Sequence, residues 1–562
     1  MTPTTHEEYL SHLSSQIIIH ADNRLFWEQV STYGSELASL LEISLDPVRE
    51  ALADLYCPTG NGAPKDACAM LRSWLTMTLC REGSPTLWAT RLKREPLLAI
   101  LTGFAPGQTP CATTHIDFLK RLADGPYAAR TQQDVPLIQR LKGWHLRRLD
   151  EATKQRSAAA DAAGKQQSDL LADTLLEQAQ QPCDLHDLQT RLDHLFVELG
   201  LKLTLDAHLL PSQVTVEGDG TAEPSGASSQ GQRACDCPAG SKCGCARNYT
   251  SATAQWCYDV RHGWTFGDRS YTISVHINGH DIPLMTILPG GNETDFTLSL
   301  KALDRLLKLL EDLDTSLQIR IFIGDGHHNA MGIYRYLKAK GIIPIIPLNE
   351  NSQPKQPETT TTPETTTTPE TTTTPKTNPK TKKTTVTPRP QIEMYPNITF
   401  EPDGTPLCPG GCRMRHQGYN ARKAAHIFAC PCTRKNKAGD WIFHAAECPF
   451  QKDCTPKEKK MGHTLYIKSE ADLRLFPPIP RNSKRFKELY AHRSGTERQN
   501  SVADSYQVDG RHRNATYILI RLTFVNICKH ARIRRKEGGQ NTHQAYLHDA
   551  LRQLDLSSLL PN

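Results

Sequence analysis

The chain has 562 residues, more than one ordinary compact domain holds, so we expect several domains. Hydrophobic residues make up 38% of it and charged residues 22%, and no apolar run approaches the roughly 20 residues that span a bilayer, which argues against a membrane role. The net charge of +6 favours nucleic-acid binding only weakly, but basic residues concentrate between Arg481 and Arg535, as expected for phosphate contacts.

The compartment follows from the N-terminal sequence and the cysteines. The first residues lack the basic start and apolar core of a signal peptide, so we expect the protein in the cytosol. Seventeen cysteines in a cytosolic chain indicate metal ligation or packing rather than disulfides.

Residues 1–125 have apolar side chains at helical spacing and are predicted to form a helical N-terminal domain, with Pro64 and Asp66 opening one helix. The sequence TLWATRLKREPLLAILTGFAPGQTPCATTHIDFLKRL predicts a helix, a Pro/Gly turn and a helix. This arrangement suits DNA binding, and it is also common in ordinary helical bundles. Residues 126–210 are predicted to be a helical connector.

The pattern changes at residues 211–350, where strands and helices alternate as in an α/β domain. The predicted strands are QVTVEGDG, TISVHIN, IPLMTILPG, IRIFIGDG and GIIPIIPLN, and the predicted helices are FTLSLKALDRLLKLLEDL and AMGIYRYLKAK. The fold class is therefore multidomain α+β.

Three further regions follow. Residues 351–391 contain the repeat PETTTTPETTTTPETTTTPK, whose Pro and Thr content predicts a disordered linker. Residues 392–465 form a cysteine-rich insertion, and residues 466–562 end the chain in helices that include TERQNSVADSYQV.

Two aspartates lie at the ends of predicted strands in similar settings, Asp219 in VEGDGT and Asp325 in IFIGDGHH. Carboxylates at strand ends, with small neighbours that let a ligand approach, suit a hard divalent cation. Asp-Gly is also an ordinary turn dipeptide, and taken singly either aspartate would be read as a turn. His327 and His328 follow Asp325 closely and could touch metal or phosphate, but beside a helix start they are expected to be capping or surface residues.

A third acidic residue lies in YAHRSGTERQNS, where Tyr490, Arg493 and Glu497 have the spacing Y-x2-R-x3-E. This resembles the signature of DDE-type insertion-sequence transposases. The order also agrees: an Asp on the first strand, an Asp after a later strand, and a Glu on a helix beyond an inserted region. Similarity to a cysteine-rich branch of this family extends over most of the chain outside the Thr/Pro repeat.

The resemblance implies a ribonuclease H-like catalytic domain, with residues 211–350 as its first part and residues 466–562, carrying Glu497, as its last. Asp219, Asp325 and Glu497 would hold two Mg²⁺ or Mn²⁺ ions. The enzyme would cleave the ends of its own mobile element and join them to target DNA, so double-stranded DNA is the implied partner. A homodimer on DNA, and a bacterial host with the protein at the nucleoid, are the corresponding expectations.

The resemblance also implies DNA contacts by Tyr490 and Arg493, whose alternative role is packing and capping of the Glu497 helix. Many relatives carry a basic residue about two turns after the Glu, whereas this chain has Asp504. Arg498, Arg511 and Arg513 are the candidates to replace it. The alternative functions are a catalytically inactive, zinc-stabilised DNA-binding descendant, and a nuclease that cuts without joining.

Two groups of cysteines have spacings that suit structural Zn²⁺. Four thiols of the first lie within eleven residues, at Cys235, Cys237, Cys243 and Cys245. The second resembles an inserted zinc ribbon, with Cys408, Cys412, Cys430 and Cys432 as the preferred ligands and Cys448 and Cys454 as substitutes. The alternative for either group is a set of reduced thiols in small loops.

Overall fold

The structure is a computed structural model of the whole chain. It describes residues 5–33, 43–57, 65–128, 145–149, 158–177, 188–206, 208–238, 243–259, 263–277, 279–288, 293–348, 390–444, 463–504, 520–527, 550–552 and 554–556, with Ala38, Leu40, Leu41, Thr59, Gly290, Gly291, Cys448, Tyr517 and Ile518.

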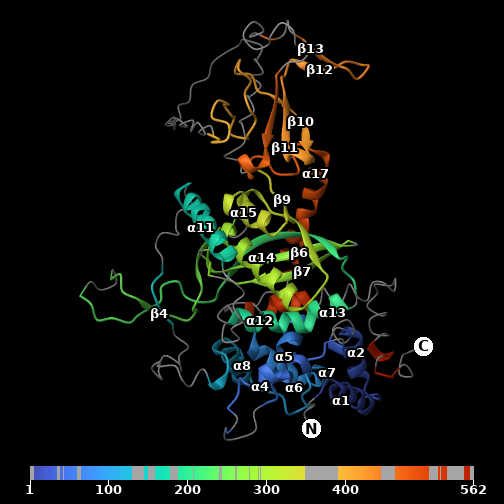
Figure 1. Cartoon of the computed structure of the whole chain (residues 1–562). Coiled ribbons are helices and arrows are strands. Elements are labelled where there is room, and N and C mark those ends of the chain that lie inside the picture. Colours follow the sequence, from blue (N-terminus) through green and yellow to red (C-terminus); the bar gives the residue numbers. More distant parts are fainter. Residues whose placement is uncertain are drawn as a thin grey trace, which may run out of the picture.

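A six-stranded sheet lies at the centre of the molecule (Figure 1). Strand β6 pairs antiparallel with β2, β5 and β7, whereas β2, β8 and β9 run parallel in that order. The bounds are β2 Gln213–Pro224, β5 Gln255–Asp259, β6 Gly263–Ile277, β7 His280–Ile287, β8 Gln318–Ile323 and β9 Ile343–Ile345. The parallel strands are joined by helices, as parallel pairing requires.

Helices cover both faces of this sheet. On one face α11 (Ala158–Glu177), α14 (Asp295–Asp312) and α15 (Met331–Ala339) pack on one another and share a core with residues such as Val216 and Ile273. On the other face lie α17 (Lys484–Tyr490) and α18 (Ser494–Asp504). Phe486 of α17 packs against Ile321, Ile323 and Ile345, so the last part of the chain returns to the sheet.

A helical body built from both ends of the chain lies below the sheet in Figure 1. Its core contains Trp74 and Trp88 from the N-terminal helices together with Tyr517, Phe524 and Leu551. The helices are α1 His6–Ile19, α2 Arg24–Thr32, η1 Asp46–Val48, α4 Arg49–Ala53, α5 Ala67–Leu79, α6 Pro85–Arg94, α7 Pro96–Leu101 and α8 Ala112–Asp124, joined by α12 Leu188–Phe196, η3 Val197–Leu201 and α13 Lys202–Asp206.

Two smaller parts extend from the sheet. The insertion at the top of Figure 1 has a three-stranded sheet and a hairpin, made of β10 Arg415–Asn420, β11 Ala425–Ala429, β14 Thr464–Lys468, β12 Thr433–Lys435 and β13 Trp441–Phe443. A lobe at the side contains β1 His145–Arg147, β3 Gln232–Arg233 and β4 Arg247–Tyr249. The lobe is therefore built from residues of the connector and of the long segment between β2 and β5.

The elements predicted from residues 211–350 are confirmed, each as the expected helix or strand. Asp66 is the N-cap of α5, where its side chain accepts a hydrogen bond from the amide of Ala69 at 2.7 Å. The predicted helix, turn and helix correspond to α6 and α7, a turn with positive φ at Gly103 and Gly107, and α8. Pro64 and the Thr/Pro repeat lie outside the described residues.

Within the described residues, no helix is both long enough and apolar enough to cross a membrane.

A buried ion pair links the C-terminal helix to the central sheet. Arg521 donates to Glu223 at 2.6 Å, and the hydroxyl of Ser270 donates to the other oxygen of Glu223 at 3.0 Å. Both side chains of the pair are only 2% exposed. Loss of one partner would therefore leave an uncompensated buried charge.

We expect Arg521→Met to destabilise the protein by about 3–5 kcal/mol, measured by urea unfolding, because Glu223 would stay buried without its cation. Arg24→Met is the control, since the pair of Arg24 with Glu28 is exposed and should contribute less than about 1 kcal/mol. Equal unfolding midpoints for the two variants would contradict the assigned role of this ion pair.

Candidate functional site

Strand register brings Asp219 and Asp325 together. Asp219 lies within β2, and Asp325 follows β8 as the N-cap of the short helix η5 (Gly326–His328). The last parallel pair of these strands is Glu217 with Ile323. Continued by two residues, the same register puts the two aspartates side by side, where neighbouring strands are about 4.8 Å apart.

Arg493 links Glu497, the third predicted carboxylate, to the two aspartates. This arginine belongs to η10 (Ala491–Arg493), and it donates to Glu497 on α18 at 2.9 Å. Its guanidinium also lies 3.8 Å from Oδ2 of Asp325, and its charge lowers the pKa of Asp219. Two carboxylates from distant segments therefore lie within 4 Å of one cation, and a third, that of Asp219, interacts with its charge.

Asp325 is held in its ionised form. Burial opposes ionisation, but the hydrogen bond and charge of His328, with the charges of His327 and Arg493, outweigh it and bring the pKa of Asp325 well below its usual range. Oδ1 of Asp325 lies 2.7 Å from Nδ1 of His328 and accepts from the amide of His327 at 2.8 Å. His328 is thus a capping residue, as expected, but it is fully buried rather than on the surface.

Asp219 has the opposite electrostatic setting. Burial raises its pKa to about 7, and the charges of Asp295 and Asp325 add to this effect while Arg493 and His328 oppose it. The ionised form of Asp219 is therefore costly in the absence of a further cation. Such a carboxylate is poised to gain stability from a positive ligand.

The glycines beside Asp219 make room for protein groups rather than for a ligand alone. A Cβ on Gly220 would lie 2.3 Å from Oδ1 of Asp295, the first residue of α14. Asp295 is 8% exposed, and its other oxygen accepts from Arg269 at 2.9 Å. Sequence reasoning missed Asp295, although the glycine after Asp219 was a signal of close packing.

The proposed DNA-contacting residues have protein partners. Tyr490 stacks on Phe486 with ring centroids 6.0 Å apart, and Arg498 donates to both oxygens of Asp281 at 2.8 Å. Arg481, at the start of the basic stretch, donates to the carbonyl of Ile346 at 2.9 Å and to the hydroxyl of Tyr334 at 2.8 Å. Arg511 and Arg513 lie outside the described residues.

A second buried acidic group lies under α18. Glu217 is 2% exposed, and burial followed by the charge of Asp281 raises its pKa to about 8. A Cβ on Gly495 would lie 2.3 Å from Glu217 and 2.6 Å from Asp281. Gly495 therefore allows the helix that carries Glu497 to pack directly on the strand that carries Asp219.

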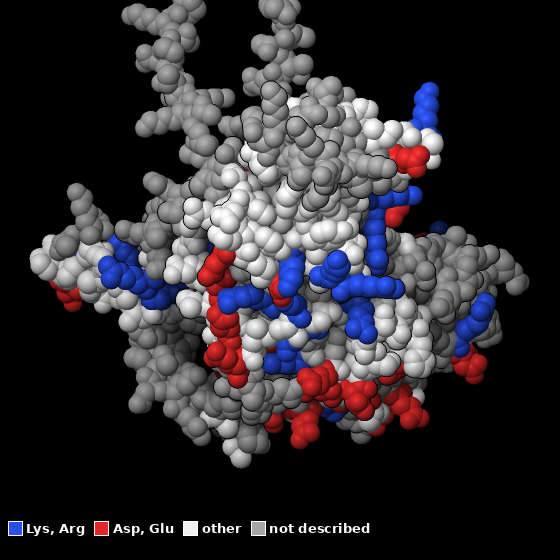
Figure 2. Space-filling view, turned by 45° about the horizontal axis from the view of Figure 1, so that its top comes forward, with Lys and Arg blue, Asp and Glu red and all other residues white. Residues whose placement is uncertain are grey.

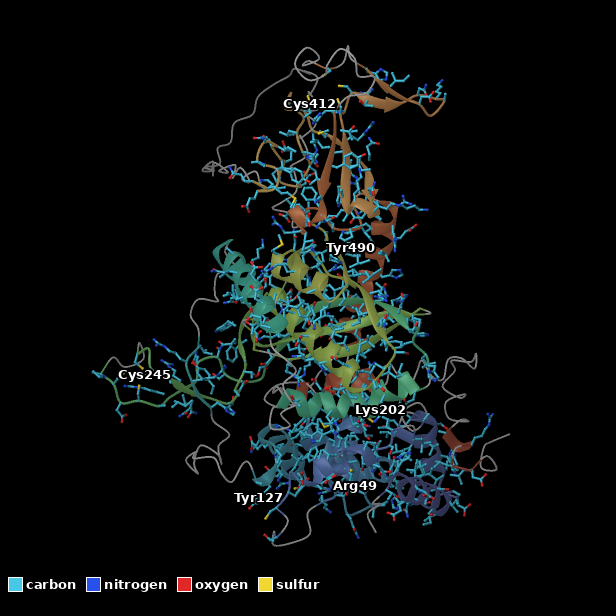
Figure 3. The ribbon with its side chains drawn as sticks, in the orientation of Figure 1. Arg49, Tyr127, Lys202, Cys245, Cys412 and Tyr490 are labelled. Carbon is cyan, nitrogen blue, oxygen red and sulfur yellow. The ribbon has the colours of Figure 1, made fainter. Side chains whose placement is uncertain are left out.

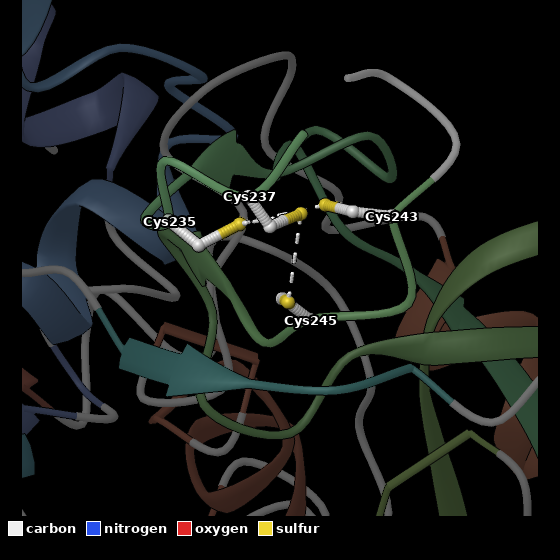
Figure 4. A group of neighbouring side chains, drawn as sticks. All are labelled: Cys235, Cys237, Cys243 and Cys245. Carbon is white, nitrogen blue, oxygen red and sulfur yellow. Dashed lines mark hydrogen bonds between the residues drawn. The ribbon is translucent and has the colours of Figure 1, made fainter. Parts of the chain in front are cut away.

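The first cysteine group closes into a cluster in the side lobe (Figure 4). Sγ of Cys235 lies 3.7 Å from that of Cys237 and 3.5 Å from that of Cys243, and Cys245 lies 4.0 Å from Cys237. Four sulfurs around a tetrahedral zinc with Zn–S bonds of about 2.3 Å are about 3.8 Å apart. These thiols could therefore hold a metal ion.

The thiols of this cluster differ in pKa. Hydrogen bonds from the amide of Cys237, the thiol of Cys243 and the side chain of Arg233 lower the pKa of Cys235 to about 6. Hydrogen bonds to Cys235 and Cys237 raise the pKa of Cys245 to about 12. A divalent cation would favour the thiolate form of all four.

The second cysteine group is looser. Among the described residues, only the first group has three or more ligand atoms that all lie within 4.8 Å of one another. Cys408 and Cys412 close a tight turn, in which the amide of Cys408 donates to the carbonyl of Cys412 at 2.8 Å. Burial and the neighbouring Cys430 and Cys448 raise the pKa of Cys432 to about 11, so Cys448 lies near the preferred set. Cys454 is outside the described residues.

Figure 3 places these features in separate parts of the molecule: Cys245 in the side lobe, Cys412 in the insertion, and Tyr490 between the insertion and the helical body. The thiol groups are therefore distinct from the carboxylate site.

We expect Asp219→Asn to raise the melting temperature in a metal-free buffer at pH 8 by a few degrees. The raised pKa of about 7 means that stability from this carboxyl is lost as pH rises through 7, and asparagine avoids that loss. The gain should shrink towards pH 5.

Asp325→Asn is the opposing control. The pKa of Asp325 is lowered, so its ionised form stabilises the fold above pH 4 and its loss should reduce the melting temperature at pH 8. Shifts of the same sign for both variants would contradict the assigned electrostatics.

A scan of the chain against protein-family models finds no match, and searches of the curated proteins and of the solved structures find none either.

Proposed function

We propose that this protein is a DDE-type transposase that uses Asp219, Asp325 and Glu497 to cleave and join DNA at the ends of its own insertion sequence. One observation carries the proposal: Arg493 pairs with Glu497 on α18 and lies 3.8 Å from Asp325 after β8, and its charge interacts with Asp219 on β2. These segments are more than 100 residues apart in sequence, so their convergence depends on the fold.

The topology supports a ribonuclease H-like catalytic domain. The first strand of the large sheet in chain order carries Asp219, Asp325 follows a later strand parallel to it, and Glu497 lies on a helix that follows the insertion. This is the order of acidic residues that the sequence resemblance predicts. The parts of the catalytic domain before and after the insertion would pack together, since α17 and α18 lie on the central sheet.

The donor set fits magnesium or manganese. Three carboxylates carry up to three negative charges against the single positive charge of Arg493, and oxygen ligands are those that these hard cations prefer. Such ions, when bound, would activate the attacking water or 3′-hydroxyl and stabilise the leaving oxygen. Asp219, Asp325 and Glu497 would hold them, and Arg493 would turn towards the scissile phosphate.

Surface charge supports a nucleic-acid substrate. Figure 2 shows lysine and arginine side chains gathered across the middle of one face, with acidic side chains along its edge. A cavity of about 490 Å³ between α15, β9 and the insertion is lined by Lys338, Arg422, Lys423 and Lys468, and by Glu470, which pairs with Lys468. Basic surfaces of this kind suit phosphate backbones.

A zinc-stabilised DNA-binding descendant without catalysis is the second candidate. The pairing of Arg493 with Asp325 and Glu497 favours it, because these contacts compensate the carboxylates without any metal. Cleavage distinguishes the two functions.

We expect cleavage of a labelled DNA fragment carrying the element's ends, with Mn²⁺ or Mg²⁺, to fall below roughly a thousandth in Glu497→Gln. The amide keeps the shape of the side chain but removes the charge that would bind metal. The readout is the appearance of cut ends on a denaturing gel.

Glu488→Gln is the matched control, since Glu488 is an exposed glutamate on α17 that pairs with Lys484. It should cleave as the native protein does. Binding of the ends without cutting by the native protein would instead favour the inactive descendant.

We further propose that Cys235, Cys237, Cys243 and Cys245 hold one structural Zn²⁺. Cys243→Ser should lower the zinc content by one equivalent per chain, measured by elemental analysis, because serine replaces one of the four sulfur ligands. Cys111→Ser should leave it unchanged, since Cys111 is exposed and belongs to neither cysteine group. Equal zinc content in both variants would remove the assignment.

A further inference from the structure

A buried pair of side chains lies directly behind the carboxylate site. His328 and Tyr271 are both fully buried, and Nε2 of His328 lies 2.7 Å from the hydroxyl of Tyr271. The other ring nitrogen, Nδ1, lies 2.7 Å from Oδ1 of Asp325. A hydrogen-bonded chain therefore runs from Tyr271 on β6, through His328, to Asp325 at the end of β8.

The glycines that precede the two aspartates make room for this pair. A Cβ on Gly218 would lie 2.3 Å from the hydroxyl of Tyr271, and a Cβ on Gly324 would lie 2.7 Å from the ring of His328. Real Cβ atoms do not approach other atoms so closely. The two Gly-Asp-Gly sequences are thus shaped by one buried feature that touches both strands.

The proton on His328 lies on the nitrogen that faces Asp325. Nδ1 faces two groups of Asp325: the carboxylate oxygen Oδ1 at 2.7 Å, and the backbone amide nitrogen at 3.1 Å, whose N–H points towards it. An unprotonated Nδ1 would accept from the amide but repel the closer carboxylate oxygen, so we place the proton on Nδ1, which then donates to Oδ1. Nε2 then accepts from Tyr271 in the neutral imidazole, or donates to it in the charged one. The bond to Asp325 is the same in both states.

This bond fixes which carboxylate oxygen faces the site. Oδ1 of Asp325 is engaged by His328 and by the amide of His327 at 2.8 Å, whereas Oδ2 is the oxygen that lies 3.8 Å from Arg493. Two donors on one oxygen prevent the carboxylate from rotating freely. Oδ2 is therefore held towards the point where the three carboxylates converge.

We propose that His328, supported by Tyr271, is a positioning residue that holds Oδ2 of Asp325 ready for a divalent cation. The inference rests on the proposed function and adds a residue to it. Hydrogen-bonding partners that orient metal ligands typically change metal affinity 10–100-fold when they are removed.

Two substitutions separate positioning from packing. In His328→Asn the side-chain amide nitrogen is in the same δ position as Nδ1, so it can still donate to Asp325. In His328→Gln the nitrogen is one bond further out, as Nε2 is, so it can reach Tyr271 but loses the bond to Asp325. Both variants replace the rigid imidazole ring with an open-chain amide, so a general packing defect would affect both.

The measurement is binding of Mn²⁺ alone, by electron paramagnetic resonance titration, after a melting curve in chelator shows each variant to be folded. We expect affinity within about threefold of the native value for His328→Asn and a 10–100-fold loss for His328→Gln. Tyr271→Phe should resemble His328→Asn, because both keep a donor to Asp325 and lose only the contact between the hydroxyl of Tyr271 and residue 328.

Asp325→Asn separates failure of this inference from failure of the proposed function. If Asp325→Asn loses Mn²⁺ binding but the two His328 variants bind alike, whether normally or weakly, the positioning role is overturned and the metal site stands. If the native protein binds no Mn²⁺, or if Asp325→Asn binds it as the native protein does, the proposed function fails and this inference fails with it.

Discussion

The parallel pairing of β2 with β8 is the contact on which the candidate site depends. Its register, with Glu217 opposite Ile323, brings Asp219, inside β2, beside Asp325, just after β8. Both strands are buried from two sides, by α14 and α15 on one face and by α17 and α18 on the other. A one-residue slip would turn these aspartates towards the opposite face, so the packing of both layers fixes their direction.

Asp219 and Asp325 are neighbours, but their surroundings shift their pKa values in opposite directions. Asp325 has histidine and backbone donors that favour its ionised form, whereas Asp219 has mainly burial and like charges that disfavour it. Arg493 is the cation that both share with Glu497. A site with more carboxylates than cations has uncompensated negative charge, and a bound metal ion in the proposed chemistry would neutralise it.

The cysteine groups have a different relation to the fold. The first lies in an excursion between β2 and β5, and no described residue from 225 to 254 belongs to a hydrophobic cluster of the protein. A metal ion would supply cross-links that such a small lobe cannot obtain from hydrophobic packing. The second lies in an insertion with its own core around Phe400, Phe428 and Phe476, which depends less on a metal.

The sequence by itself determined the elements of the central domain and the candidate carboxylates. Period-two alternation located β2, an apolar run located β8, and a period of 3.6 located α14 and α15, because the spacing of apolar residues follows the faces that an element buries. The resemblance of the spacing of Tyr490, Arg493 and Glu497 to a transposase signature implied an acidic residue on a helix, and Glu497 lies on α18.

Only the tertiary structure decided which side chains meet. Some contacts join residues from different elements, as Arg493 pairs with Asp325 and Arg498 with Asp281. Others depend on a rotamer that packing selects, as in the bonds from His328 to Asp325 and Tyr271. The same holds for the C-terminal residues that share the core of the N-terminal helices. Local periodicity records how much of an element is buried but not which element buries it, so these contacts could be known only from the folded chain.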